Sequence, residues 1–538
     1  MVYMEGTVIA PIKDLELIKR RYKKARTKAD LWISLLEACY HYTVPSRNLF
    51  YWTSQYQGAQ KNARVWDTTA VEGVRNFVSK IQGGLCPPQQ CWFLLEAGVD
   101  VPDEHKEEVN LALQELTNKI YHYIRRSNFD LAINECFYDL AIGTGCLICN
   151  PGSNDDMPLE FFSVPLARVA IEETVTNALE TNFRWWDEIR IEDIKELWPQ
   201  AVLSPLVQNL YNEDQNATIK DLVEGTIYYP NEKNEKEKYR YVVFFEDQFF
   251  VDERMESSPW IVFRWSKVNN EIYGRGPVID ALPSILSLNE LARVEMASAN
   301  FNVSKPYMAY SDGVFNPWTF KLEPNTVIPV APNSAGQWPI QAFPDTANPQ
   351  FMQLTSVDLR MQINKLLYAD PLGPVTSPQQ TATEIALRQR NMAEEIGPPF
   401  TRLQPELLTR VLKRVMHILE KKGLISKVRI NGKEVQITYK SPLVVAQGQQ
   451  DVQGFMNWFQ VMQSVQGPEA ALVNVNPVKF PQWSSQKLGI DPTIITSEQQ
   501  MEEFYASQSE KAQEQEMMMM EGAQGGTQQP IPANTGPV

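Results

Sequence analysis

The stretch YGRGPVIDALPSILSLNELARVEMASANFNVS, residues 273–304, predicts the element around which the rest of the chain is organised. Its opening glycines and proline, up to Pro277, end whatever element precedes them. Apolar residues then recur at spacings of three and four positions, which predicts one apolar stripe on a helix over 279–304. At a rise of 1.5 Å per residue, this helix is a rod of about 39 Å. The stripe consists of Ala281, Ile285, Leu288, Ala292, Met296, Ala299 and Val303.

A proline-rich segment follows this helix. Eight prolines lie between residues 305 and 349, so the segment cannot be helical and is expected to form short strands and loops. A second helix, from about Gln350 to Tyr368, brings the chain back. Two helices that flank a proline-rich tip predict an out-and-back arm rather than a closed pocket.

The residues before the arm divide into a helical part and a β-rich part. The first 150 residues are expected to be mainly helical, with helices over 68–83 and 104–127. The basic run Lys19–Lys28 and the apolar positions from Leu31 to Cys39 predict one long amphipathic helix. From Leu159 to Trp265, short runs rich in Val, Ile, Tyr and Phe predict a β-rich insert.

The residues after the arm return to helical patterns. Residues 371–380 hold three prolines and one glycine and are expected to form a loop. Thr381–Glu384 is a capping box, and the helix it opens is expected to end at Gly423. A hairpin around Asn431-Gly432 and further helix over Gly448–Phe504 complete the pattern. The fold class predicted from these elements is α+β and mainly helical.

The charge balance limits the partners that the surface suits. The chain has 65 Asp and Glu residues and 50 Lys and Arg residues, which gives a net charge of −15. This charge argues against a protein that binds nucleic-acid phosphates over its whole surface. The run Lys19–Lys28 holds seven bases and is the main exception. It suits either a solvated helix face or a contact with nucleic acid or a neighbouring subunit.

Motifs for catalysis or cofactor binding are absent from the sequence. There is no phosphate-binding GxxxxGK[ST] loop, no GxSxG elbow and no HExxH, so no cofactor and no catalytic residue is predicted. Only Cys146 and Cys149 have metal-ligand spacing, and without a second pair they are expected to be small buried hydrophobes rather than zinc ligands. Six cysteines in so long a chain indicate a reducing compartment. No signal peptide or membrane span is predicted.

The order and spacing of several short segments resemble the portal, or head-to-tail connector, proteins of short-tailed, podovirus-type bacteriophages. The resemblance covers nearly the whole chain, from about residue 15 to 515, and each segment alone is a weak signal. The segments are Tyr42–Pro45, Gly73–Lys80, Cys86-Pro87 with Trp92, Gly143–Leu147, Tyr273–Arg275 with Leu286, Leu288 and Leu291, Thr381–Ile385, Gly489–Asp491 and Thr496–Gln499.

The resemblance implies the portal fold, with a wing, a two-helix stem, a clip, a tunnel loop and a helical crown. It also implies a homo-oligomer, usually a ring of twelve subunits around a channel for double-stranded DNA. An acidic, Gln- and Met-rich tail and Pro398-Pro399 have no counterpart in that pattern. Carried onto this chain, the parts are a wing over 1–278, stem helices over 279–304 and 350–370, a clip over 305–349, a tunnel loop over 371–380, a long helix returning to the wing over 381–440, a crown over 441–506 and a partly disordered tail over 507–538.

The resemblance also implies the sites and the partners. DNA passes the tunnel loop, which carries no Lys or Arg and is therefore expected to make a low-friction contact. The clip is expected to bind terminase and then tail adaptor and nozzle proteins, since aromatic side chains dominate binding hot spots. Major capsid and scaffolding proteins are further partners, in a virion whose portal vertex is assembled in the host bacterial cytoplasm. The tunnel-loop residues are Pro371, Leu372, Gly373, Pro374, Val375, Thr376, Ser377, Gln379 and Gln380, and the clip contacts are Asp312, Phe315, Trp318, Lys321 and Trp338.

Other interpretations fit the same sequence features. The chain is alternatively a nucleic-acid-processing enzyme with an unrecognised active site, or a capsid-interior or adhesive structural protein without a channel. The loop over 371–380 is alternatively an ordinary solvated loop, and the clip aromatics alternatively pack between neighbouring subunits. A closed ring distinguishes the portal interpretation from the rest.

Overall fold

The computed structural model describes most of the chain, and its contacts divide the chain into two compact units. The first comprises 1–82, 123–381 and 396–425, and the second comprises 83–122, 382–395 and 426–538. The described residues are 12–50, 58, 60–98, 100–152, 154, 156–173, 179–229, 237–303, 307–309, 340–342, 349–369, 397–426, 435–439, 442–467, 474–477 and 479–488, with single positions between 501 and 507. Their helices and strands form an α+β fold, as predicted.

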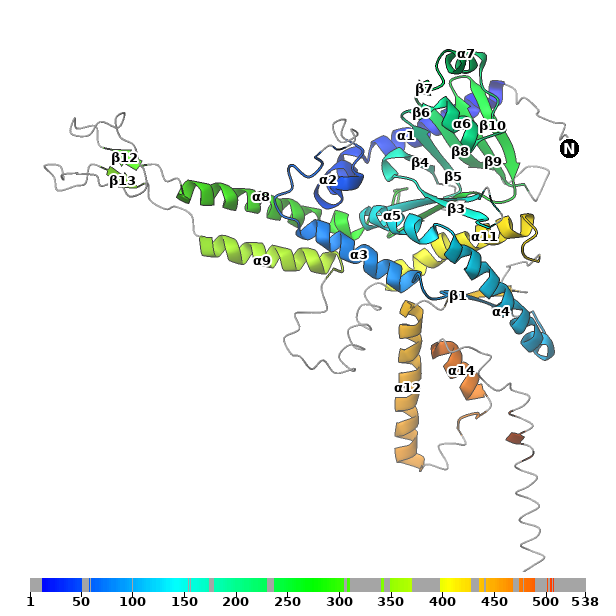
Figure 1. Cartoon of the computed structure of the whole chain (residues 1–538). Helices are drawn as coiled ribbons and strands as arrows, with labels where there is room; N and C mark the ends of the chain where they lie inside the picture. The colour runs from blue at the N-terminus through cyan, green and yellow to red at the C-terminus, as the bar shows by residue number, and fades with distance from the viewer. Residues whose placement is uncertain are drawn as a thin grey trace, which may run out of the picture. The chain divides into compact units, whose positions relative to one another are not determined.

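An antiparallel five-stranded sheet in the order β10-β9-β8-β5-β4 lies in the first unit. Successive side chains of a strand point to opposite faces. Val242 and Phe244 therefore pack under helix α1 (Ile12–Asp30), whereas Tyr241 and Val243 pack under helices α6 and α7 (Figure 1). These elements are β4 (Val169–Glu172), β5 (Thr181–Trp186), α6 (Ile191–Leu197), α7 (Pro205–Glu213), β8 (Leu222–Tyr228), β9 (Tyr239–Phe245) and β10 (Gln248–Met255), with β6 (Ile189–Arg190) paired to β7 (Thr218–Ile219) beside α6.

A three-stranded antiparallel sheet in the order β11-β2-β3 lies next to the arm. Helix α5 packs against β2 and β3, while α11 contacts β2 and the π-helical turn η4 contacts β11. These elements are α5 (Phe129–Ile142), β2 (Thr144–Pro151), β3 (Leu159–Ser163), β11 (Trp260–Arg264), η4 (Gln404–Leu408) and α11 (Thr409–Lys421), with 3-10 turns η1 (Pro45–Arg47) and η3 (Leu166–Arg168). The predicted β-rich insert is confirmed, although it also holds α6 and α7, which were not expected.

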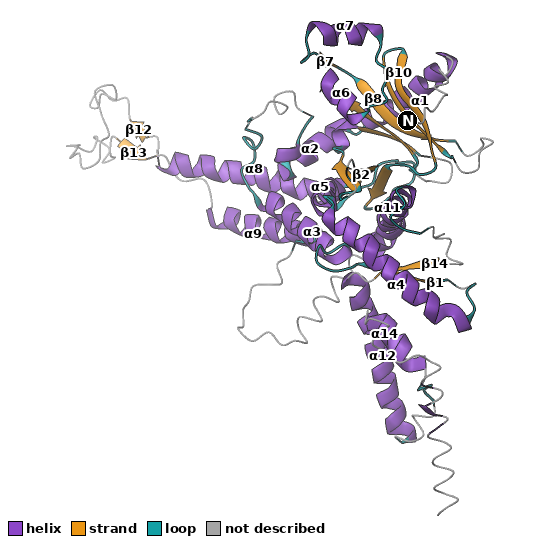
Figure 2. Cartoon of the chain, turned by 45° about the vertical axis from the view of Figure 1, so that its right-hand side comes forward, coloured by secondary structure: helices purple, strands orange, loops and turns teal. Residues whose placement is uncertain are grey.

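Two long helices, α8 (Pro277–Val303) and α9 (Pro349–Leu366), run side by side (Figure 2). They cover the two stretches in which the sequence predicts helices. Beyond them, strand β12 (Tyr307–Ala309) pairs antiparallel with β13 (Ile340–Ala342). The chain thus leaves along α8 and returns along α9, and we call α8, β12, β13 and α9 the arm.

The predicted long amphipathic helix after Lys19 is wrong. Helix α1 ends at Asp30, and a separate helix α2 (Ile33–Thr43) begins two residues after Leu31. Trp32 sits at the break because its ring lies 5.8 Å from that of Tyr273 and under the guanidinium of Arg275. A tertiary contact therefore overrides a local apolar pattern that continued across the break.

The second unit contains two groups of described elements. In the first, β1 (Phe93–Ala97) pairs with β14 (Val435–Tyr439), and the β1 amides of Leu95 and Ala97 donate to the side chains of Thr117 and Asn110 on α4 (Asp103–Arg126). In the second, α12 (Pro442–Gln466) packs on α14 (Lys479–Leu488) through the rings of Phe455 and Phe480, 4.8 Å apart. The residues of the predicted Asn431-Gly432 turn lie outside the described part of the chain.

Candidate functional site: the arm and its anchorage

The arm has a buried inner stripe and uncovered apolar residues outside it. On α8 the predicted stripe is buried as far as Ala292, but Met296 and Ala299 are exposed. On α9, Ile363 is buried, whereas Leu354, Val357 and Met361 are 64%, 45% and 57% exposed. These three lie at positions i, i+3 and i+7, so they share one side of the helix. Among the described residues, the arm therefore presents apolar side chains that are largely exposed in a single chain.

Tyr368, just after the end of α9, is held by contacts with three other residues. Tyr368 adopts a left-handed backbone conformation, with φ of 52°, at a position where glycine is preferred. Its carbonyl accepts a hydrogen bond of 2.9 Å from the ammonium of Lys80 on α3 (Thr69–Leu85). Its ring lies 5.8 Å from that of Trp265 and 6.5 Å from that of Phe77. These contacts hold Tyr368 in place despite the backbone strain.

The start of α8 is fixed by a close approach of two backbone segments. A Cβ added to Gly143 would lie 2.0 Å from the carbonyl oxygen of Gly274. The amide of Gly276 donates to the carbonyl of Ile142 over 2.8 Å, and the amide of Gly274 donates to the hydroxyl of Thr144 over 2.8 Å. Only glycine at 143 allows this approach, which joins the end of α5 to the beginning of the arm.

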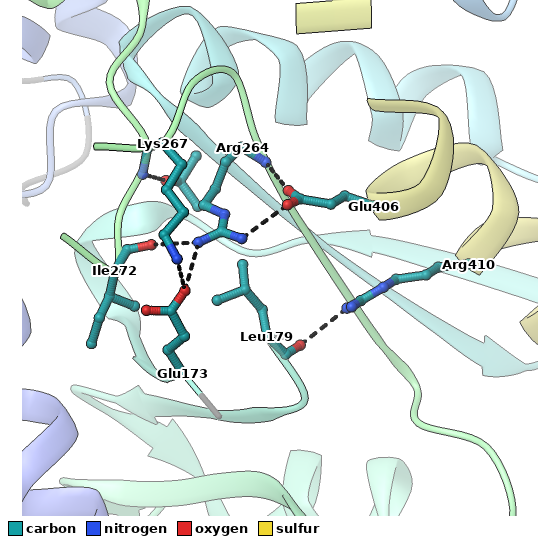
Figure 3. A network of polar contacts seen from close by, with 9 residues as sticks. Glu173, Leu179, Arg264, Lys267, Ile272, Glu406 and Arg410 are labelled. Carbon is teal, nitrogen blue, oxygen red and sulfur yellow. Dashed lines mark hydrogen bonds and ion pairs between the residues drawn. The ribbon is translucent and has the colours of Figure 1, made fainter. Parts of the chain in front are cut away.

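A buried polar network surrounds Arg264, whose side chain is 3% exposed (Figure 3). Its main-chain amide and its guanidinium each donate to the carboxylate of Glu406, both over 2.9 Å. The guanidinium also donates to Glu173 over 3.2 Å, and Lys267 donates to the same carboxylate. Since an isolated buried charge is costly, two carboxylates facing two cations keep this junction stable.

A second buried ion pair lies among α2, η1 and α5. The hydroxyl of Tyr40 donates to Asp139 over 2.6 Å, and the guanidinium of Arg47 donates to the same carboxylate over 2.9 Å. Burial raises the pKa of Asp139, while the charge and hydrogen bonds of Arg47 act in the opposite direction. Because α2 and α5 both contact α8, this pair stiffens the base of the arm.

The basic run lies on α1 and is only partly free. Lys19 pairs with Asp247, Arg21 pairs with Glu172, and the guanidinium of Arg26 lies over the ring of Trp185 at 4.6 Å. These three of the seven bases hold α1 on the sheet, and Arg20 pairs with Glu16 on the same helix. The others, Arg20, Lys23, Lys24 and Lys28, are exposed, which is compatible with a solvated face and with a contact to another molecule.

The site residues expected from the resemblance lie in the tunnel loop and the clip. The tunnel-loop residues Pro371–Gln380 and the clip residues Asp312, Phe315, Trp318, Lys321 and Trp338 lie outside the described part of the chain. Cys146 and Cys149 lie buried on β2 as free thiols. Among the described residues, no group of three or more His, Cys, Asp or Glu could hold a metal ion, and no helix is long and apolar enough to cross a membrane.

The anchoring residues were not identified from the sequence. Arg264 carried the only signal, as a lone charge in the apolar run Trp260–Trp265, whose burial requires a partner. Nothing local marks Glu406 as that partner, since the two are 142 positions apart.

Residues 15–495 match the model of a family described as the bacteriophage head to tail connecting protein. The chain belongs to this family. The resemblance to portal proteins noted in the sequence is thereby confirmed. The chain is also 22% identical, over 506 residues, to the probable portal protein of Bordetella phage BPP-1, covering 89% of this chain and 88% of that protein.

Two solved structures are more distant matches to this head-to-tail connecting chain. One is the virion of a native gene transfer agent particle, with 14% identity, a TM-score of 0.34, and 68% of this chain and 83% of the other covered. The other is the neck of a native gene transfer agent particle computed with C12 symmetry, with 13% identity, a TM-score of 0.37, and 79% and 91% covered.

Proposed function

We propose that this chain forms a ring at one vertex of a phage capsid and that the ring is the conduit for double-stranded DNA during packaging and ejection. Membership of the head-to-tail connecting family is the observation that carries the proposal. The arm supports it, since two long helices held rigidly at their base are suited to line up side by side in a closed ring of copies.

The uncovered apolar residues of the arm supply the ring contact. On α9 these residues are Leu354, Val357 and Met361. On α8, Val294 and Met296 are also exposed. Fully burying one such side chain contributes about 1.5–3 kcal/mol. A neighbouring copy that covers these residues therefore stabilises the ring, and the same residues leave a single chain prone to assemble.

The finer assignments follow from the resemblance and are part of the proposal. Helices α8 and α9 serve as the stem, residues 305–349 as the clip that docks terminase and later the tail proteins, and 371–380 as the tunnel loop that meets DNA. The wing covers 1–278 and the return 381–440, and the crown covers 441–506. The ring itself is non-enzymatic and works in the virion after assembly in the host cytoplasm. No observation among the described residues favours the alternative of a nucleic-acid-processing enzyme.

The ring is tested with a variant of the arm. The purified chain is examined by mass photometry and by cryo-electron microscopy, beside a variant carrying Val357→Asp and Met361→Asp. Both positions are exposed in the single chain, so the variant is expected to keep its circular dichroism spectrum and lose the ring. Leu131→Asp on α5, which is 74% exposed, is the matched control and is expected to assemble.

Three results decide between the alternatives. A closed wild-type ring with an opening wider than a DNA duplex agrees with the proposal. A wild-type chain that stays single, alone and with scaffolding protein, contradicts it. A ring that forms equally well from the arm variant contradicts the role of the α9 residues.

A further inference from the structure

The five-stranded sheet is covered by α1 on one face and by α6 and α7 on the other, so the outer surfaces of these helices point in opposite directions. Val242 and Phe244 of β9 lie under α1, and Tyr241 and Val243 lie under α6 and α7. What α1 exposes and what the α6–α7 pair exposes therefore lie on opposite sides of this part of the first unit (Figure 1).

The outer surface of α1 is basic. Arg20, Lys23, Lys24 and Lys28 are exposed, at spacings that place them along one side of the helix. Two acids, Glu16 and Asp30, lie in the same stripe, and Glu16 accepts a bond of 3.4 Å from Arg20. Four bases against two acids form what we call the basic face.

The outer surface of the α6–α7 pair is acidic. Glu192 and Glu196, one turn apart on α6, are exposed, as are Glu213 and Asp214 at the end of α7. The nearby bases are occupied, because Arg190 pairs with Asp193 and Lys195 lies 3.5 Å from the ring centre of Tyr211. We call these four exposed carboxylates the acidic face.

Both faces also carry exposed leucines. Leu17 and Leu31 are exposed near the basic face, and Leu206 and Leu210, one turn apart on α7, are exposed near the acidic face. Charged side chains with leucines beside them suit a protein partner better than the phosphate backbone of DNA, which is bound through charge and polar contacts.

A ring needs two different surfaces on each subunit that complement each other, because copies related by rotation meet head to tail. We propose that the basic face of one copy contacts the acidic face of the next copy around the ring. The inference rests on the proposed ring and names a second, electrostatic contact in addition to the apolar contact of the arm. Complementary charge gives such a contact its orientation and speeds assembly.

A charge exchange within one chain tests this contact. One variant carries Lys23→Glu with Lys24→Glu, another carries Glu192→Lys with Glu196→Lys, and a third carries all four changes. Each two-residue variant is expected to need at least tenfold more protein to assemble at 0.1 M salt, as followed by mass photometry. The four-residue variant restores opposite charges across the contact and is expected to assemble like the wild type.

The control is Lys413→Glu with Lys421→Glu, two exposed lysines of α11, which makes the same change in net charge as the first variant. It is expected to assemble normally. Raising the salt to 0.5 M is expected to reduce the difference between the two-residue variants and the wild type, because exposed charges are then screened.

Several outcomes would overturn the contact. If the two-residue variants assemble like the wild type, or the four-residue variant does not recover, the faces do not meet. If Lys23→Glu with Lys24→Glu leaves the ring intact and lowers only DNA retention, the basic face serves DNA instead. These failures leave the ring proposal standing, whereas a wild-type chain that forms no ring ends both proposals.

Discussion

The main-chain amide and the guanidinium of Arg264 both donate to the carboxylate of Glu406, each over 2.9 Å. The next residue, Trp265, lies against Tyr368 at the end of α9. Two consecutive residues at the end of β11 therefore hold the π-helical turn η4 on one side and the arm on the other. π-Helical turns of this kind frequently mark functional sites, and here the turn places Glu406 against Arg264.

Replacing Glu406 is expected to weaken this junction. Glu406→Gln keeps the size of the side chain but removes one of the two carboxylates that face Arg264 and Lys267. Breaking a buried pair from one side costs about 3–5 kcal/mol. The first thermal unfolding transition is expected to fall by several degrees. Glu290→Gln, which removes an exposed ion pair with Arg293 on α8, is the control and is expected to leave that transition unchanged. If the first unfolding transition had the same midpoint temperature in both variants, the contact between Arg264 and Glu406 would not stabilise the fold as expected.

Glycine at 143 is expected to be essential for folding. In Gly143→Ala the new methyl group would overlap the carbonyl oxygen of Gly274, a backbone atom that cannot move aside cheaply. We expect loss of soluble protein, measured as the fraction recovered after expression. Gly83→Ala is the matched control, because nothing lies within 4 Å of its added Cβ and alanine favours the helix. Normal recovery of Gly143→Ala would show that α5 and the start of the arm can separate.

The thiols of Cys39 and Cys149 are expected to be inert in the native chain. Burial raises the pKa of Cys39 and of Cys149 to about 12, so the reactive thiolate forms only far above physiological pH. Raising the pH from 7 to 9 should therefore leave both unlabelled by a thiol reagent, whereas Cys91, which is partly exposed, should react. In denaturant all six should react. Fast labelling of Cys39 or Cys149 at pH 8, located by mass spectrometry, would contradict this burial.

Adding positive charge to the proposed tunnel loop is expected to slow DNA passage. Gln379→Lys together with Gln380→Lys offers new phosphate contacts, each of which raises the salt dependence of binding by about 0.9 in log–log slope. Packaging, measured as nuclease-protected DNA against time, should slow at 50 mM salt and recover at 200 mM. Gln379→Asn with Gln380→Asn is the control and should package normally. Unchanged packaging by the lysine variant at both salts would indicate that the loop does not touch DNA.

Local patterns predicted many of the elements. The apolar spacing on either side of 305–349 and the prolines within it are local signals, and α8 and α9 form in the stretches that they marked. The strand Tyr239–Phe245 lies within the predicted β-rich insert. Gly423, expected to end its helix, has the left-handed φ of 73° that such a cap requires.

The tertiary contacts that position α1 and the arm could not be predicted from local patterns. The break between α1 and α2 depends on Trp32 reaching Tyr273, and the partner of Arg264 lies 142 positions away. The separation of α1 from α6 and α7 depends on which face of β9 each covers. Such contacts join residues far apart in the chain, and periodicity carries no information about them.

By itself, then, the amino-acid sequence determined the helices of the arm, the β-rich insert, the acidic balance and the membership of the head-to-tail connecting family, because each is recorded in residue order, spacing or composition. Only the tertiary structure decided how the arm is held and which bases of α1 remain exposed. It also decided that the basic face of α1 and the acidic face of α6 and α7 lie on opposite sides of the sheet. Those properties arise when distant segments pack together and compete for the same partners.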